Sequence, residues 1–210
     1  MAIAYDSTAA LAIVTAGDEH FELQSWSLRA FHNIFKKEYK GTYIKMNLVE
    51  QNIAGNIFAV AYQDNGRFYV SVVDNKGGEL DNLDVTEHLG LDTLSKPITG
   101  FWEPMITCCF IENDDLFIQV YHRLHKKQYH FTYSYTKHDN LSNTIITANR
   151  DPSCTQKNFP VKSFYSTVTK NVLTFYRQGF CQTVNPAYPA ETRIEKITDK
   201  DLGNMYLLFD

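Results

Sequence analysis

The segment Ile106–Tyr121, with the sequence ITCCFIENDDLFIQVY, places a short acidic turn between two apolar runs. Short apolar runs on either side of Asn and Asp residues predict two antiparallel strands joined by a tight turn. Weaker copies of this pattern occur at Ile13–Trp26, Val60–Val73 and Tyr165–Tyr176. A unit that recurs along a chain indicates a fold built from structural repeats. The sequence therefore predicts a β-rich domain made of similar hairpin units.

Equivalent positions in these units recur at a nearly constant interval. Phe21, Phe68 and Phe117 each occupy the second position of a return strand, at intervals of 47 and 49 residues, and Leu173 follows 56 residues later. Gln119 is a polar exception to the apolar alternation of these strands. Such a period, with several strands per unit, is typical of a β-propeller, in which sheets pack radially because one sheet cannot bury both faces alone.

Two stretches resemble the units of known propellers. Thr15-Ala-Gly-Asp18, followed by Gln24-Ser-Trp26-Ser27, resembles the inner strands of a WD-repeat blade, although the chain lacks a Gly-His pair at the expected place and any Trp-Asp pair. Tyr62–Gly66 (YQDNG) resembles the hairpin units of propeller lectins. The resemblance implies an all-β fold, a β-propeller-like array of about four antiparallel blades, as a small closed ring or part of a larger propeller. A β-sandwich or an irregular barrel is the alternative.

The repeat also predicts the domain organisation. We expect a single β-rich domain over residues 1–210, with repeat units near 11–50, 55–95, 100–140 and 160–190. In the third unit, three strands are expected in succession, followed by a polar loop over 137–160. A last apolar strand, Met205–Phe209, would start a fifth blade or close the ring.

Two segments fit both helix and strand patterns. For 29–39 we predict a strand with a loop, and for 161–179 two strands joined at residues 170–171, by analogy with the other units. The stretch Asp84–Glu87 predicts a helix of one or two turns, capped by the Asp84 side chain and ended by Gly90.

Composition restricts the classes of partner. A hydrophobic fraction of 44% and an aromatic fraction of 14% are enough for a sizeable core. The net charge of −4 argues against a general binder of nucleic acids or membrane surfaces, because phosphate binding needs an excess of Lys and Arg. No apolar run approaches the roughly 20 residues of a membrane helix, and no secretory signal pattern is recognisable. We therefore expect a cytoplasmic protein with free thiols and no membrane contact.

The chain shows none of the familiar catalytic or cofactor-binding motifs. A Gly-rich phosphate loop, an HExxH helix and a GxSxG elbow are all absent. The four cysteines form no CxxC pair, and the adjacent Cys108 and Cys109 are expected to be buried packing residues. Asp114 and Asp115 are interpreted as turn formers. We predict a protein that is not an enzyme, with no catalytic residues, no cofactor and no metal site.

Positive charge gathers at one predicted hairpin tip. The candidate binding residues there are His122, Arg123, His125, Lys126 and Lys127. A metal site would require histidines to converge across the hairpin, and the favoured interpretation is instead a solvated basic tip. Such a tip could contact an acidic partner or RNA, with Tyr121 and Tyr129 nearby to stack on bases. Trp102, in the linker Gly-Phe-Trp-Glu-Pro, is the candidate for stacking on a sugar ring.

These observations favour one function over a second. The first is a non-enzymatic, propeller-like scaffold that mediates protein–protein contacts within a larger assembly, because rigid blades present several loops at once. The alternative is a carbohydrate-binding, lectin-like propeller. Protein partners are expected, with glycan and RNA as the alternatives.

Overall fold

The structure is a computed structural model. It describes residues 2–5, 10–16, 20–27, 29–40, 45–52, 54–64, 67–90, 106–122, 127–140, 145–148, 160–176 and 178–199. The predicted strand at Met205–Phe209 and the predicted turn at Asn65-Gly66 lie outside these residues.

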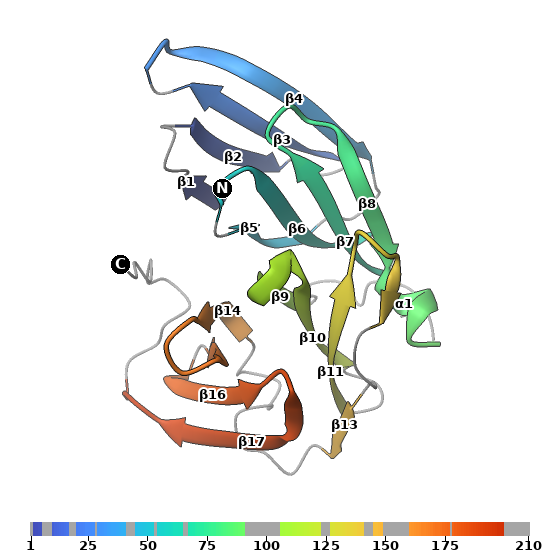
Figure 1. The fold of residues 1–210 in the computed structure, drawn as a ribbon, viewed down its shortest axis with the longest axis vertical. Helices are drawn as coiled ribbons and strands as arrows, with labels where there is room; N and C mark the ends of the chain where they lie inside the picture. The colour runs from blue at the N-terminus through green and yellow to red at the C-terminus, as the bar shows by residue number, and fades with distance from the viewer. Residues whose placement is uncertain are drawn as a thin grey trace. The chain divides into compact units, whose positions relative to one another are not determined.

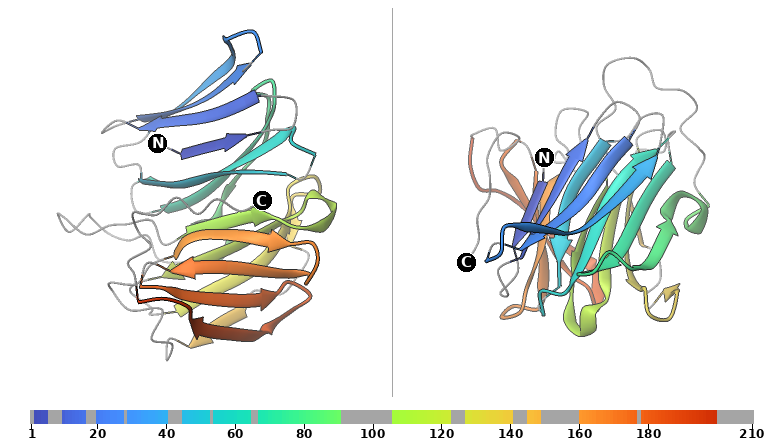
Figure 2. Two further views of the ribbon diagram at one scale, coloured as in Figure 1. Left: turned by 90° about the vertical axis from the view of Figure 1, so that its left-hand side faces the viewer. Right: turned by 90° about the horizontal axis from the view of Figure 1, so that it is seen from above.

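The described strands form four antiparallel sheets (Figures 1 and 2). Neighbouring strands follow the order of the chain, except that β13 pairs with β11. Sheet 1 contains β1 (Ala2–Tyr5), β2 (Ala10–Ala16), β3 (His20–Ser27) and β4 (His32–Lys40). Sheet 2 contains β5 (Lys45–Gln51), β6 (Ile57–Asp64), β7 (Arg67–Asp74) and β8 (Glu79–Asp84).

Sheet 3 begins with β9 (Ile106–Phe110), β10 (Leu116–His122) and β11 (Lys127–Ser134), and both β12 (Asp139–Asn140) and β13 (Ile145–Ala148) pair with β11. Sheet 4 contains β14 (Pro160–Ser166), β15 (Asn171–Tyr176), β16 (Phe180–Asn185) and β17 (Tyr188–Lys196). Two short helices complete the described elements, the four-residue α1 (Val85–His88) and the 3₁₀ turn η1 (Glu112–Asp114).

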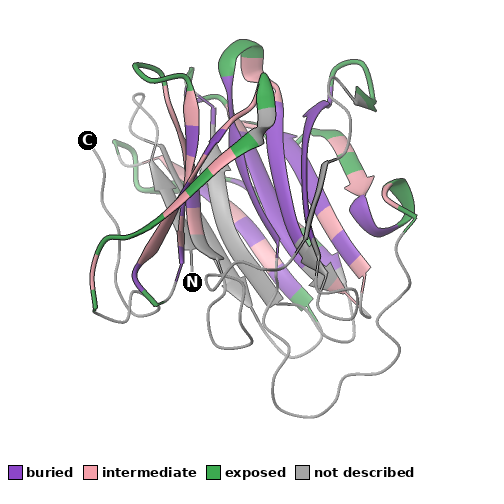
Figure 3. Cartoon of the chain, turned by 90° about the horizontal axis from the view of Figure 1, so that it is seen from below, coloured by how far each residue is buried: buried purple, intermediate pink, exposed green. Residues whose placement is uncertain are grey.

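The chain divides into two compact units. The first comprises residues 1–104 together with 135–138, and the second comprises 105–134 with 139–210. Within the first unit β1 lies against β5, and within the second β9 lies against β14. In both units the sheets therefore meet through their first strands. Figure 3 shows that buried residues run along the middle strands, whereas exposed residues gather at turns and outer strands.

The first unit is held together by an aromatic cluster between sheets 1 and 2. Phe21 and Tyr39 stack with ring centroids 4.4 Å apart, and Tyr62 packs edge-on against Phe21 at 5.1 Å. Tyr39 Oη and Ser71 Oγ are 2.8 Å apart, so this buried hydroxyl group has a polar partner. Burial raises the pKa of Tyr62 to about 12, so the phenol stays neutral at physiological pH. The apolar residues that alternate along β3 and β6 therefore pack against each other and join sheet 1 to sheet 2.

Sheet 3 differs between its two faces. One face carries apolar residues at successive register positions: Ile106, Cys108, Phe110, Leu116, Ile118, Val120, Tyr129, Phe131 and Tyr133, all buried. The other face is mixed: it carries the polar residues Thr107, Gln119 and Gln128 and also the apolar residues Cys109 and Phe117, all of them buried. Because strand side chains alternate between faces, the buried polar residues of β9, β10 and β11 all lie on one side of sheet 3.

The polar face of sheet 3 is hydrogen-bonded to sheet 4, within the second unit. Gln119 Nε2 donates to Tyr176 Oη at 2.7 Å and to Gln182 Oε1 at 2.6 Å. Gln128 Nε2 donates to the same two acceptors, at 2.6 and 3.2 Å, and Tyr176 Oη donates to Gln182 Oε1 at 2.7 Å. Thr174 Oγ1 donates to Gln119 Oε1 at 2.8 Å. We call these five side chains the buried amide network.

Most of the strand predictions are confirmed. Residues 32–40 form β4, not a helix. Strands β14 and β15 are joined by a turn at 167–170, which overlaps the predicted turn at 170–171 only at residue 170. Cys108 and Cys109 are buried free thiols, as expected for packing residues. The loop predicted over 137–160 is wrong in part, because β12 and β13 fall inside it and pair with β11. These strands have two and four residues, too short to give a periodic signal.

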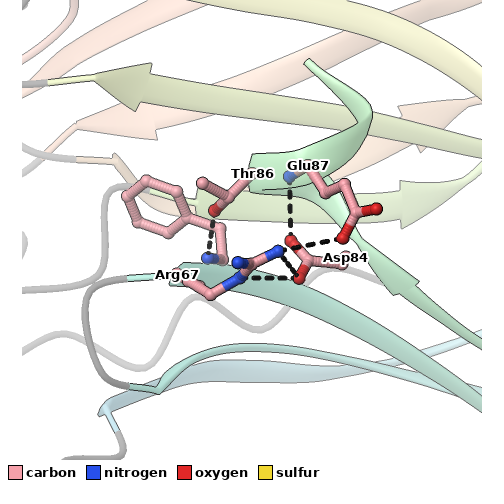
Figure 4. Close-up of polar contacts among 5 residues, drawn as sticks. Arg67, Asp84, Thr86 and Glu87 are labelled. Atoms are coloured by element: carbon pink, nitrogen blue, oxygen red, sulfur yellow. Dashed lines mark hydrogen bonds and ion pairs between the residues drawn. The ribbon is translucent and has the colours of Figure 1, made fainter. Parts of the chain in front are cut away.

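Helix α1 is fixed to the start of β7 by polar contacts that Figure 4 shows. Asp84 Oδ1 accepts from the Glu87 backbone N–H at 2.9 Å, as the capping pattern predicts. Arg67 Nε donates to Asp84 Oδ2 at 2.7 Å, and its Nη2 lies 3.1 Å from Glu87 Oε2. The Phe68 backbone N–H donates to Thr86 Oγ1 at 2.7 Å. Gly90 follows with a φ of 59°, which ends the helix.

Replacement of Asp84 by alanine is expected to destabilise the protein by about 1 kcal/mol, because the N-cap acceptor is lost. The measurement is urea unfolding, combined with hydrogen exchange of the Glu87 amide, which should lose protection. Arg67→Met is the matched control, since it removes the ion pairs of Arg67 with Asp84 and Glu87 but keeps the cap. Equal loss of amide protection in both variants would show that the ion pair, and not the cap, holds α1.

Candidate interaction surface

The predicted basic tip falls largely outside the described residues. Arg123, His125, Lys126 and Trp102 all lie in segments that the structure does not describe. His122 and Lys127 are described only as backbone, where they form the last register pair between β10 and β11. The basic tip and the sugar-stacking role of Trp102 therefore stay predictions.

His130, which the sequence places near this tip, lies inside sheet 3. It pairs with Gln119 across β10 and with Ile145 across β13, and its side chain is fully buried. The Phe117 ring lies 5.7 Å from the imidazole. Burial lowers the pKa of His130 to about 3, so the ring is neutral at physiological pH. A buried position in the sheet excludes His130 from a solvated hairpin tip.

The turn between β3 and β4 exposes an aromatic residue in a strained conformation. Ser27 O accepts from the Phe31 N–H at 2.8 Å, and Ser27 Oγ accepts from the Ala30 N–H at 3.2 Å. Phe31 has a φ of 51°, and 84% of its surface is exposed. A bulky residue in this left-handed region is an outlier, because its Cβ crowds the backbone. Phe31 therefore combines two unfavourable features, a strained backbone and an exposed aromatic ring.

The turn between β14 and β15 has the same geometry with different side chains. Ser166 O accepts from the Lys170 N–H at 2.8 Å, and Ser166 Oγ accepts from the Thr169 N–H at 3.2 Å. Lys170 has a φ of 58° and forms an ion pair with Glu112. The turn therefore accepts a polar residue at the strained position, and its geometry alone does not demand Phe31.

Two further exposed side chains stand within three residues of Phe31. Ile34, on β4, is 40% exposed, and Arg29 in the turn is exposed. The underlying strand is anchored, since Phe35 is buried and lies so close to Gly77 that a Cβ there would be 2.8 Å from its ring. Lys37 Nζ contacts Glu79 Oε2 at 2.7 Å across to β8. We call Arg29, Phe31 and Ile34 the β3–β4 tip, an apolar and cationic projection on a rigid base.

Sheet 1 also brings together three side chains able to bind a metal ion. The ligand atoms of His20, Glu22 and Glu38 lie within 4.8 Å of one another. Glu22 and Glu38 are direct register partners, and His20 is two residues before Glu22 on the same strand. Sequence spacing gave no signal for this group, because strand pairing brings the third residue in from β4.

The sequence comparisons find no match, whereas the comparison of structures finds many. No protein-family model matches the chain, and no curated protein has a significantly similar sequence. A chain of the nidogen/laminin complex is structurally similar, with a TM-score of 0.60 and 11% identity, over 95% of this chain and 65% of that one. The β-propeller domain of Cps50 (Swd1) from Myceliophteria thermophila is similar with a TM-score of 0.59 and 11% identity, and the match covers 95% of this chain and 55% of that one. The WD40 domain of Toxoplasma gondii coronin is similar with a TM-score of 0.60 and 10% identity, and the match covers 91% of this chain and 43% of that one.

These likenesses define the class of fold. The four antiparallel sheets match parts of β-propellers and WD40 domains. This match confirms the predicted all-β, propeller-like array. The chain spans less than two thirds of each of these matched chains. Among the described residues, no helix is long and apolar enough to span a membrane.

The β3–β4 tip was missed by sequence reasoning. Phe31 and Ile34 fall at helical spacing, and the prediction of a strand with a loop over 29–39 did not place a tight turn at Phe31. A signal was present, since Ser27 and Ser166 both stand four residues before the strained position. Serine often bonds to backbone N–H groups in turns, so this spacing is physically meaningful. The exposure of Phe31, by contrast, can be seen only once the strands are in place.

Proposed function

We propose that this protein is a non-enzymatic, cytoplasmic propeller scaffold that binds a protein partner through the β3–β4 tip. The observation that carries the proposal is Phe31, which is 84% exposed at a φ of 51°. Strain of this kind typically costs about 1–3 kcal/mol and clusters at functional sites, and the matching turn at Lys170 shows that the turn itself does not require a phenylalanine. An exposed phenylalanine on a rigid hairpin is suited to fill an apolar pocket on another protein.

Three further observations support a scaffold. The fold is one that commonly presents loops to protein partners, and the tip stands on a sheet with a buried aromatic core. Arg29, two residues before Phe31 in the same turn, adds an exposed cation to the tip, and arginine and aromatic residues are both enriched in interface hot spots. The described cysteines Cys108, Cys109 and Cys181 are free thiols, which suits a reducing compartment.

The test is replacement of Phe31 by glycine. Because glycine adopts positive φ without strain, the variant is expected to gain about 0.5–1 kcal/mol of stability. Binding to the partner should weaken at least about tenfold, since the apolar anchor is removed. Stability is measured by urea unfolding. Binding is measured by quantitative affinity capture from cell extract, followed by titration of the captured partner.

Lys170→Gly is the matched control, because it relieves the same strained position in the β14–β15 turn. It should show a similar gain in stability with no loss of binding. Partners captured equally well by wild type and both variants would contradict the proposed binding surface. A loss of stability in Phe31→Gly would contradict the assignment of strain.

A further inference from the structure

We propose that His20, Glu22 and Glu38 bind one divalent transition-metal ion of the Zn²⁺ class on sheet 1. This site is independent of the proposed partner surface. It also departs from the expectation drawn from sequence spacing, which predicted no metal site.

Backbone geometry alone directs the three side chains to one place. His20 and Glu22 are two residues apart on β3, so their side chains leave the same face of the sheet. Glu38 on β4 is the direct register partner of Glu22. The opposite face of β3 carries Phe21 and Leu23, which are fully buried. The ligand atoms, within 4.8 Å of one another, therefore stand on the open side of a sheet whose other side is firmly packed.

The arrangement is electrostatically unfavourable without a cation. Two carboxylates directly opposite each other on neighbouring strands repel and destabilise the pair. Lys36 Nζ, 2.5 Å from Glu22 Oε1, offsets part of this repulsion, and Gln24 Nε2 donates to Glu22 Oε2 at 2.8 Å. Together these contacts lower the pKa of Glu22, Lys36 being the main cause. Neither the His20 imidazole nor the Glu38 carboxylate is hydrogen-bonded or ion-paired to another described side chain.

The donor set selects the class of metal. One imidazole and two carboxylates suit Zn²⁺ and its neighbours in the transition series, whereas Ca²⁺ and Mg²⁺ prefer oxygen ligands alone. Three protein ligands leave at least one coordination position for water or for a ligand from outside. Binding needs only side-chain rotation, because His20 and Glu38 are exposed and the Lys36 side chain is 53% exposed. Lys36 must leave Glu22 when the ion enters, so the ammonium group and the metal compete.

This competition provides the test. Isothermal titration with Zn²⁺ alone, and the visible absorption spectrum of the Co²⁺ form, should show one site in the wild-type chain. His20→Ala and Glu38→Gln are each expected to weaken it at least about tenfold, since one of three ligands is lost. Lys36→Gln is expected to tighten binding several-fold. Lys37→Gln makes the same change in charge on the opposite face of β4, where Lys37 contacts Glu79, and should leave affinity unchanged.

Two further controls separate this site from other ligands of the chain. The titrations are repeated in a background with Cys154→Ser and Cys181→Ser, because thiolates also bind Zn²⁺. Circular dichroism melts of each variant confirm folding, and a metal-dependent rise in Tm is expected only in chains that keep all three ligands. Unchanged affinity in His20→Ala would overturn the proposal. Equal effects of Lys36→Gln and Lys37→Gln would likewise overturn it, since they would show only a general response to charge.

Discussion

Acidification from about pH 6 to about pH 4 is expected to destabilise the protein by roughly 3 kcal/mol through His130 alone. The pKa of this histidine is lowered by burial from 6.5 to about 3. Above pH 6.5 the imidazole is neutral in both states and imposes no cost. Between pH 6.5 and about 3, the unfolded chain binds a proton that the folded chain cannot accept. Stability therefore falls by about 1.4 kcal/mol for each pH unit in this range.

The structural cause is the absence of a charge-stabilising neighbour. Neither Nδ1 nor Nε2 of His130 has a hydrogen-bond partner among the described residues, and the side chain is fully buried. The nearest described ring is that of Phe117, which cannot accept the proton. An imidazolium in this position would be a buried, unpaired charge, which is costly. Protonation is thus coupled to opening of sheet 3.

The measurement is urea unfolding across the pH range for wild type and His130→Phe. The variant places an aromatic ring beside Phe117 and cannot titrate, so its stability should fall less steeply as the pH drops. His88→Gln is the control, because His88 is exposed on α1. Identical pH slopes in wild type and His130→Phe would show that His130 is protonated without unfolding.

The repeated hairpins could be predicted from sequence because their signals are local. Alternating apolar residues and Asx-rich turns located most of β6, β7, β9 and β10, since period-two burial depends only on neighbouring residues. The cap at Asp84 was equally local. The short strands β12 and β13 were missed because pairing with β11, and not their own sequence, makes them strands.

The functional groups depend on long-range pairing and could not be predicted in the same way. Gln119 appeared only as a polar exception in an apolar strand, and its bonds to Tyr176 and Gln182 cross 57 and 63 positions. Glu38 joins His20 and Glu22 through the register of β3 with β4. His130 stands three residues after the predicted basic tip in the sequence, yet pairing of β11 with β10 and β13 buries it inside sheet 3. In each case the decisive partner is distant along the chain, so no local pattern identifies it.

Removal of one amide from the buried network is expected to have the largest effect on stability. Gln182 Oε1 accepts from Gln119 Nε2, Gln128 Nε2 and Tyr176 Oη, at 2.6, 3.2 and 2.7 Å. Gln182→Leu keeps the volume roughly constant but leaves these donors short of an acceptor inside a buried interface. Each unsatisfied buried group costs about 1–3 kcal/mol, so we expect a loss of about 3–5 kcal/mol in urea unfolding.

A double-mutant cycle with Tyr176→Phe tests whether the residues act as one network. The phenol accepts from Gln119 and Gln128 and donates to Gln182, so the two substitutions share partners. Their combined effect should be smaller than the sum by at least about 1 kcal/mol, because neighbours in one network are not additive. Thr183→Val is the matched control, since Thr183 is the next residue on β16 and points to the other face. Strict additivity, or an equal loss in the control, would show that sheets 3 and 4 are held by apolar packing such as Phe117 against Val172 and Val184, and that the amides contribute little.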